Sequence, residues 1–194
     1  LFFISGINLN KILSAIAIIL LGIPIAWNFL HDYQKQRIEI FLDPEKDPLG
    51  AGYNLIQSKI AIGSGGITGK GFMQGTQSHL SFLPEHQTDF IFAFLTEELG
   101  FLGGITIIIL FALLISLIFS ISIKCKSIFL KFISQGVASI IFLHVVINIG
   151  MVMGLAPVVG VPLPFISYGG TMMVSTMLGI SLAINAHINK NIRI

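Results

Sequence analysis

Four long runs of residues without a charged side chain constrain this chain more than any other feature of its sequence. Each run reaches the roughly 20 residues that a helix needs to cross the hydrocarbon core of a bilayer. Charged residues make up only 10% of the chain, whereas soluble domains contain about a quarter. The sequence therefore predicts an all-α polytopic integral membrane protein with four complete transmembrane helices, at about residues 12–30, 99–123, 132–155 and 165–186.

The chain begins inside a further apolar stretch, residues 1–7, without an initiator methionine or the charged region that opens a signal peptide. We interpret this stretch as the end of a preceding span. The chain is then the C-terminal part of a larger protein, and residues 1–194 form a single membrane domain. The only cysteine, Cys125, excludes an internal disulfide and a metal site built from several cysteines.

Basic residues in the short segments beside the spans predict how the chain crosses the membrane. Cytoplasmic flanks carry an excess of Lys and Arg close to the span ends. We therefore expect the flanks that contain these residues, and the C-terminus, in the cytoplasm. The long loop 31–98 and the shorter loop 156–170 then lie on the outer face. The basic residues in question are Lys11, Lys124, Lys126, Lys131, Lys190 and Arg193.

All nine acidic residues lie between Asp32 and Glu98, so the polar chemistry of the chain is concentrated in the long outer loop. A glycine-rich run in this loop, GSGGITGKG at residues 63–71, fails the phosphate-loop pattern at both ends and contains no GxGxxG. A site for ATP or a dinucleotide is therefore not expected. Two interpretations remain open: the exposed amides of the run, with Lys59 and Lys70, hold a pyrophosphate group, or its glycines serve the backbone conformation alone.

The apolar segment that follows Pro84 opens with Thr88 and Asp89, where an N-cap and a first-turn acid would begin a helix at the membrane boundary. On such a helix Asp89 and Glu97 would share one face, about two turns apart. Burial raises the pKa of a carboxyl group, which suits a general base acting on a sugar hydroxyl. The residues alone favour the simpler interpretation, in which Asp89 caps the helix.

Two other groups of polar residues allow functional and structural interpretations. His79 and His86 stand near Glu85, but their spacing matches no metal-binding motif, so we expect no dedicated metal site. His144 and Asn148 are four residues apart in the third predicted span and therefore share one helix face. Such groups either line a cavity or join neighbouring helices by hydrogen bonds.

Three long motifs resemble the SEDS family of peptidoglycan glycan-strand polymerases. The motifs are RIEIFLDPEKDPLGAGYNLIQSKIAIGSGGITGKGF, GTQSHLSFLPEHQTDFIFAFLTEELGFLG and VPLPFISYGG. The first two look like the rod-shape branch of the family rather than its cell-division and sporulation branches. The resemblance covers nearly the whole chain and implies a fragment of a ten-span fold, in a bacterial inner membrane, that contains the later spans only.

The resemblance implies an enzyme that polymerises lipid II into glycan strands during lateral cell-wall elongation and so maintains cell shape. The acceptor sugar's 4-hydroxyl attacks the anomeric carbon of the growing chain, and undecaprenyl pyrophosphate leaves. Carried over by motif, Asp89 is the catalytic general base. Residues that the resemblance places at the substrate are Lys70, Gln77, Glu85, Thr88 and Ser167. One departure from the family pattern is Gln87, where relatives usually have a histidine.

The resemblance also implies the partners. These are lipid II, the membrane itself and a class B penicillin-binding protein that cross-links the new strands; no nucleic acid is expected. The resemblance assigns no cofactor. Whether a divalent cation (Mg²⁺ or Mn²⁺) assists the pyrophosphate leaving group stays open.

Two alternative functions need the same composition. A lipid II flippase would also have many spans and intramembrane polar groups such as His144 and Asn148. A noncatalytic scaffold of the elongation machinery would use the outer loop as a docking surface. The concentration of acids at one face favours surface chemistry over transport along a path through the bilayer.

Overall fold

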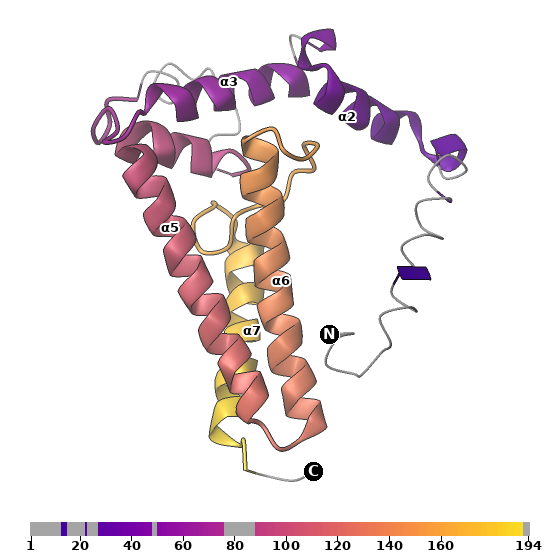
Figure 1. The fold of residues 1–194 in the computed structure, drawn as a ribbon, viewed down its shortest axis with the longest axis vertical. Helices are drawn as coiled ribbons and strands as arrows, with labels where there is room; N and C mark the ends of the chain where they lie inside the picture. The colour runs from indigo at the N-terminus through magenta and orange to yellow at the C-terminus, as the bar shows by residue number, and fades with distance from the viewer. Residues whose placement is uncertain (1–12, 15–21, 23–26, 48–49, 76–87, 192–194) are drawn as a thin grey trace.

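The computed structural model describes residues 13–14, 22, 27–47, 50–75 and 88–191. All regular secondary structure in these residues is helical. The long helices lie side by side, and shorter ones lie across one end of them (Figure 1). The elements are α2 (Asp32–Leu42), the short 3₁₀ helix η1 (Pro44–Lys46), α3 (Ala51–Ser64), α5 (Ile91–Lys124), α6 (Ile128–Val152) and α7 (Gly170–Ile188).

Helices α5, α6 and α7, of 34, 25 and 19 residues, are long and apolar enough to cross a membrane. The predicted spans 99–123 and 132–155 fall mainly on α5 and α6. The fourth predicted span began at residue 165, whereas α7 begins at Gly170, because the apolar residues before it belong to the loop. The first predicted span, 12–30, lies largely outside the described residues, so the number of spans stays a prediction.

The three long helices pack through small and medium-sized apolar side chains. Ala138 of α6 and Ala183 of α7 are 3% and 1% exposed, and Phe111 of α5 is buried with them. Lipid tails are as apolar as these side chains, so close van der Waals packing holds such helices together in a membrane, and small residues favour it. Many large apolar side chains on the outer faces, among them Leu110 and Leu117, are exposed.

Helices α2 and α3 form a platform across the end of the bundle where α5 begins and α6 ends (Figure 1). The segment 31–98, predicted to be a long outer loop, is therefore partly helical. The platform is fastened to the bundle by polar contacts: the buried Ser58 hydroxyl donates to the carbonyl of Val152 at 2.9 Å, and the Arg37 guanidinium donates to the carbonyl of Val158 at 2.8 Å. The platform and loop 156–170 are thus joined at the same end.

Helix α5 is interrupted at Gly100, whose φ of 69° and ψ of −169° are not helical. The break frees main-chain groups on both sides, and the glycine-rich segment 66–71 binds them. Two of its N–H groups donate to carbonyls before the break, and two of its carbonyls accept from N–H groups after it. The pairs are Lys70 to Glu97 (3.0 Å), Gly71 to Glu98 (3.0 Å), Phe101 to Gly66 (2.8 Å) and Leu102 to Ile67 (3.2 Å).

Glycine is required where these two segments meet. Gly69 and Gly100 both have a positive φ, of 81° and 69°, which favours glycine. A Cβ atom on Gly100 would overlap the main-chain nitrogen of Gly69, and one on Gly69 would overlap the carbonyl of Glu98. The conformational interpretation of the glycine-rich run therefore has a structural basis: the run pairs its backbone with the break in α5.

Candidate functional site

Asp89 lies in a turn formed by residues 88–90, directly before α5. The N-cap of the helix is Phe90, so the helix begins two residues later than the sequence predicted, and Asp89 precedes its first turn. The Asp89 side chain is half-buried. The carboxylate lies against loop 156–170, here named the second outer loop after its predicted side of the membrane, since its Oδ2 is 3.1 Å from the position that a Cβ atom on Gly160 would occupy.

Ser167 joins the second outer loop to this turn. Its hydroxyl donates to the carbonyl of Thr88 at 2.6 Å and accepts from the N–H of Leu163 at 2.7 Å. The structure thus brings together three residues that the sequence placed in the site, Thr88, Asp89 and Ser167, although they come from segments about 80 positions apart. Both contacts are to the main chain, and a contact of Ser167 with substrate stays a prediction.

Asn148 provides a second connection between the same segments. It is completely buried near the end of α6, and its Nδ2 donates to the carbonyls of Asp89 at 2.8 Å and of Val161 at 2.7 Å. From its sequence position Asn148 is an intramembrane polar residue that shares a helix face with His144, and neither motif nor spacing connects it with Asp89. The signal that could have linked it to the site is its position near the predicted outer end of a span, at the level of the expected outer loops.

A cavity of about 510 Å³ opens beside the turn. It lies between the start of α5, the second outer loop and the start of α7, so Ser167 belongs both to its wall and to the connection with Thr88. The exposed ring of Tyr168 marks its outer rim. Its lining is Ile91, Phe165, Ile166, Ser167, Tyr168, Gly169, Gly170 and Met173.

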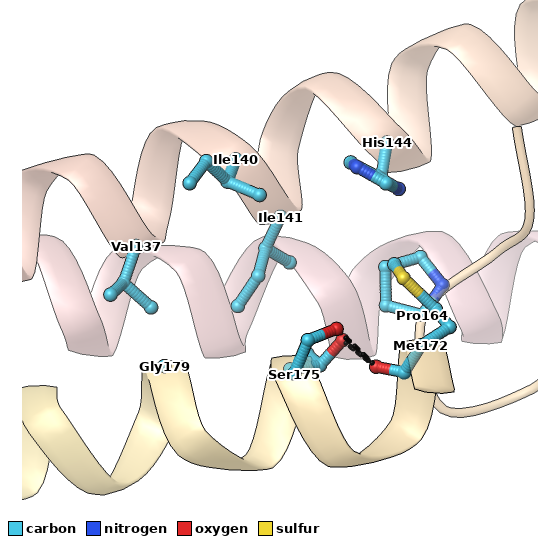
Figure 2. A pocket seen from close by; sticks show the side chains of 9 residues that line it. Val137, Ile140, Ile141, His144, Pro164, Met172, Ser175 and Gly179 are labelled. Carbon is cyan, nitrogen blue, oxygen red and sulfur yellow. Dashed lines mark hydrogen bonds between the residues drawn. The ribbon is translucent and has the colours of Figure 1, made fainter. Parts of the chain in front are cut away.

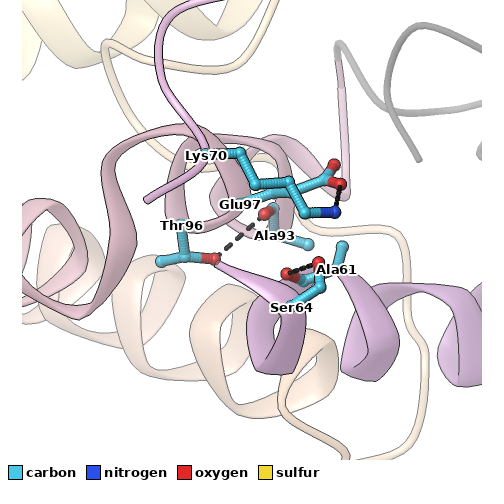
Figure 3. A network of polar contacts seen from close by, with 6 residues as sticks. All are labelled: Ala61, Ser64, Lys70, Ala93, Thr96 and Glu97. Atoms are coloured by element: carbon cyan, nitrogen blue, oxygen red, sulfur yellow. Dashed lines mark hydrogen bonds and ion pairs between the residues drawn. The ribbon is translucent and has the colours of Figure 1, made fainter. Parts of the chain in front are cut away.

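Glu97 does not share a cavity with Asp89. It is completely buried and forms an ion pair with Lys70, whose Nζ lies 2.7 Å from its Oε1 (Figure 3). The neighbouring Glu98 accepts from the N–H of Met73 at 3.0 Å. The expected pair of carboxylates on one face is therefore wrong. The three acids have separate surroundings: Asp89, in the turn before α5, lies at the second outer loop, whereas Glu97 and Glu98 of α5 lie at the glycine-rich segment.

The ion pair also changes the interpretation of Lys70. The sequence placed this residue at the substrate, but its ammonium group is directed to a buried carboxylate and its side chain is 24% exposed. Gln77 and Glu85, the other two predicted substrate-binding residues, lie outside the described residues, as do His79 and His86. Their roles stay predictions, and so does the absence of a dedicated metal site.

At the opposite end of the bundle, the turn after α5 lies beside the end of α7, since the N–H of Lys126 donates to the carbonyl of Lys190 at 2.9 Å. The Cys125 thiol is buried there. Burial raises its pKa, and the positive charge of Lys190 opposes that rise. The thiol therefore stays protonated at neutral pH and is a poor nucleophile.

Comparison with known proteins identifies the family to which this chain belongs. The sequence model of the FtsW, RodA and SpoVE proteins, described as cell cycle protein, matches residues 1–192. The chain belongs to the FtsW/RodA/SpoVE family. The resemblance inferred from the three motifs is thus confirmed.

Curated members of the FtsW/RodA/SpoVE family are similar to the chain along most of its length. Peptidoglycan glycosyltransferase MrdB of Escherichia coli K12 is 50% identical over 189 residues, which are 97% of this chain and 51% of the relative. Peptidoglycan glycosyltransferase RodA of Treponema pallidum is 46% identical over 159 residues, 81% of this chain and 37% of the relative. The chain spans about half the length of the curated relatives it matches.

Solved structures of the family share the fold. A chain from a peptidoglycan synthase complex, described as coordinating polymerization and crosslinking, has a TM-score of 0.76 and 34% identity, covering 98% of this chain and 52% of that one. An aspartate-to-alanine mutant of Thermus thermophilus RodA has a TM-score of 0.53 and 30% identity, covering 56% and 36%. The all-helical membrane fold expected from the sequence is confirmed.

Proposed function

We propose that this chain forms part of a peptidoglycan glycosyltransferase that polymerises lipid II, with Asp89 as its general base. The supporting observation is the arrangement of Asp89. Two side chains from distant segments hold the main chain of its turn, and a cavity opens beside it at one end of the bundle. A base must be held in a fixed geometry relative to the proton it takes.

In the proposed reaction, the 4-hydroxyl of the acceptor sugar forms a new glycosidic bond with the anomeric carbon of the growing chain. The bond from that carbon to the lipid pyrophosphate breaks, and the pyrophosphate leaves with the bonding electrons. The Asp89 carboxylate takes the proton of the attacking hydroxyl as the bond forms. Transfer of this proton strengthens the nucleophile in the transition state.

The location of the turn suits a substrate that is half lipid and half sugar. Asp89 lies directly before a helix that is apolar enough to span the membrane. The sugar rings can therefore meet the carboxylate while the isoprenoid chain stays in the bilayer. The start of α7 borders the cavity at Gly169 and Gly170, and the positive end of a helix dipole favours a pyrophosphate group.

Sidedness and partners belong to the same proposal. The end of the bundle opposite to Asp89 carries four lysines at or near it, Lys124, Lys126, Lys131 and Lys190. Because cytoplasmic flanks of membrane spans carry an excess of Lys and Arg, we infer that this end faces the cytoplasm. Asp89 then faces the outside, where a cross-linking transpeptidase of the class B penicillin-binding proteins would act on the new strand. The relative described as a peptidoglycan synthase complex supports such a partner.

The decisive experiment uses the natural full-length protein, purified with its penicillin-binding partner and given labelled lipid II. Asp89→Asn keeps the size of the side chain and removes the base. We expect glycan polymer to disappear from the gel while the complex remains assembled. Asp32→Asn, the same change at an exposed position on the platform, should polymerise normally. Normal polymerisation by Asp89→Asn would show that Asp89 is not the base.

One observation favours lipid II flipping as a second candidate function. Within the membrane, His144 lines a mostly apolar cavity of about 240 Å³ between α6 and α7, with Pro164 and Met172 opposite (Figure 2). Among the described residues its buried Nδ1 has no hydrogen-bond partner. Lipid II transport in reconstituted vesicles that His144→Leu abolishes, with polymerisation intact, would support the flippase.

A further inference from the structure

Asn148 occupies an unusual position for an intramembrane polar residue. It lies four residues before the end of α6 and is 0% exposed. Its amide nitrogen makes two hydrogen bonds, and both acceptors are main-chain carbonyls, of Asp89 and Val161. Carbonyls accept only, so the donating NH₂ group must face them, and the orientation of the amide follows from chemistry.

The two carbonyls belong to segments that have no covalent connection near this point. Asp89 is in the turn before α5, and Val161 is in the loop before α7. A single nitrogen atom that is hydrogen-bonded to both carbonyls holds the two segments at a fixed separation. Since the bond is to the carbonyl of Asp89 itself, it sets the position of the main chain from which the carboxylate projects.

Asn148 differs in this respect from polar residues that join two membrane helices. Its partners are in a turn and a loop rather than in a second helix. Ser167 holds the adjacent carbonyl of Thr88, so the turn is fastened at two successive residues. A side chain without a donor at position 148 would leave two partly buried carbonyls without this partner and would loosen the turn.

We propose that Asn148 is a positioning residue for Asp89, which its amide holds at a fixed distance from the second outer loop. This inference rests on the proposed function, because it assigns Asn148 a role in the reaction that Asp89 performs. Both hydrogen bonds of its amide nitrogen go to main-chain carbonyls, so Asn148 acts on Asp89 through the main chain. Its loss should therefore impair the chemical step and leave the binding of lipid II largely unchanged.

The test compares substitutions at Asn148 in the full-length protein with its partner. Asn148→Leu has a similar size and removes the donor, whereas Asn148→Gln keeps the carboxamide. The matched control is Asn185→Leu, the same change at an exposed position near the end of α7. Two quantities are measured: kcat and KM for labelled lipid II, and hydrogen–deuterium exchange of peptides that cover residues 88–93 and 156–163.

We expect Asn148→Leu to lower kcat on the order of 10- to 100-fold, the loss that a misplacement of about 1 Å produces, with KM within about twofold. Exchange should rise in both peptides and remain unchanged in the middle of α6. Asn148→Gln should recover most of kcat, and Asn185→Leu should match the wild type. If Asn148→Leu does not assemble with its partner, Asn148→Asp, which has the same shape but lacks the NH₂ group, takes its place.

Three results would overturn the inference. They are an unchanged kcat, a rise in KM alone, and a fall in kcat without faster exchange in the two peptides. Failure of the proposed function has a different signature, because full activity of Asp89→Asn would remove the base assignment while the exchange data still showed whether Asn148 holds the turn. The two failures are therefore distinguishable.

Discussion

A lysine at position 70 is suited to two different roles, binding a pyrophosphate group and neutralising a buried carboxylate. A lysine in a glycine-rich outer loop is well suited to a pyrophosphate group, and the sequence led to that assignment. In the folded chain its ammonium group neutralises Glu97, a carboxylate with no exposed surface. A buried charge of this kind needs a partner, since removal of the partner leaves it uncompensated in a medium of low dielectric constant.

The first prediction separates the two roles of Lys70. Lys70→Met should destabilise the protein by about 3 kcal/mol, the lower end of the range for a broken buried ion pair, and leave KM for lipid II nearly unchanged. The double variant Lys70→Met/Glu97→Gln should be less destabilised than the sum of the single variants, because no buried charge then remains. Thermal unfolding of the four proteins measures this coupling.

A substrate role for Lys70 would give a different pattern. Its replacement would raise KM strongly, and Glu97→Gln, which keeps the lysine, would not. The double variant would then show the same KM as Lys70→Met alone. That pattern would restore the assignment made from the sequence.

At the level of the elements, the sequence predicts regular helices better than it predicts where they are interrupted. The apolar runs of α5 and α6 are recognisable because length and composition suffice to identify a span. The break at Gly100 is not, because GFLGG reads as a continuation of the apolar run. Its cause is a pairing with residues 66–71, some 30 positions away, which no local pattern reveals.

Contacts between residues far apart in the sequence also explain why the candidate site could be predicted only in part. Asp89 could be identified from motif and position, whereas its contact with Asn148 joins residues 59 positions apart. The start of α7 was placed five residues too early because residues 165–169 include apolar side chains although they form a loop. In each case a non-local contact or an irregular backbone decides the outcome.

The second prediction concerns the glycine at the break. Gly100→Ala should destabilise the protein by at least about 1–3 kcal/mol, since alanine rarely adopts a φ of 69° and its Cβ would overlap Gly69. The matched control is Gly136→Ala in the middle of α6, where a Cβ would meet nothing within 4 Å. This change should stabilise the protein by about 0.5–1 kcal/mol. Equal effects of the two changes on thermal unfolding would contradict the role of Gly100.

For the whole molecule, the arrangement of charges predicts that the platform of α2 and α3 faces the outside and that the turn after α5 faces the cytoplasm. Leu42 at the end of α2 is 75% exposed, and Lys126 is exposed at the other end. In intact cells, a maleimide that cannot cross membranes should label Leu42→Cys. It should label Lys126→Cys only after the membrane is permeabilised.

The thiol of Cys125 adds little background to this experiment. Cys125 is buried and its pKa is raised by that burial, so the reactive thiolate becomes appreciable only at a pH above the usual range of a free thiol. Cys125 therefore contributes little labelling at neutral pH. Labelling of Lys126→Cys from outside the intact cell would reverse the proposed orientation.

The interruption of α5 separates the piece of the helix that crosses the bilayer from the piece that is connected to the Asp89 turn. The long piece after Gly100 must match the thickness of the bilayer, and spans do this by tilting. The short piece before Gly100 continues from the Asp89 turn, and that turn is fastened to α6 and to the second outer loop. Segment 66–71 bonds to the main chain on both sides of the break, so the two pieces meet at a fixed bend. The short piece can therefore follow the direction that the loops require, while the long piece follows the direction that the bilayer requires.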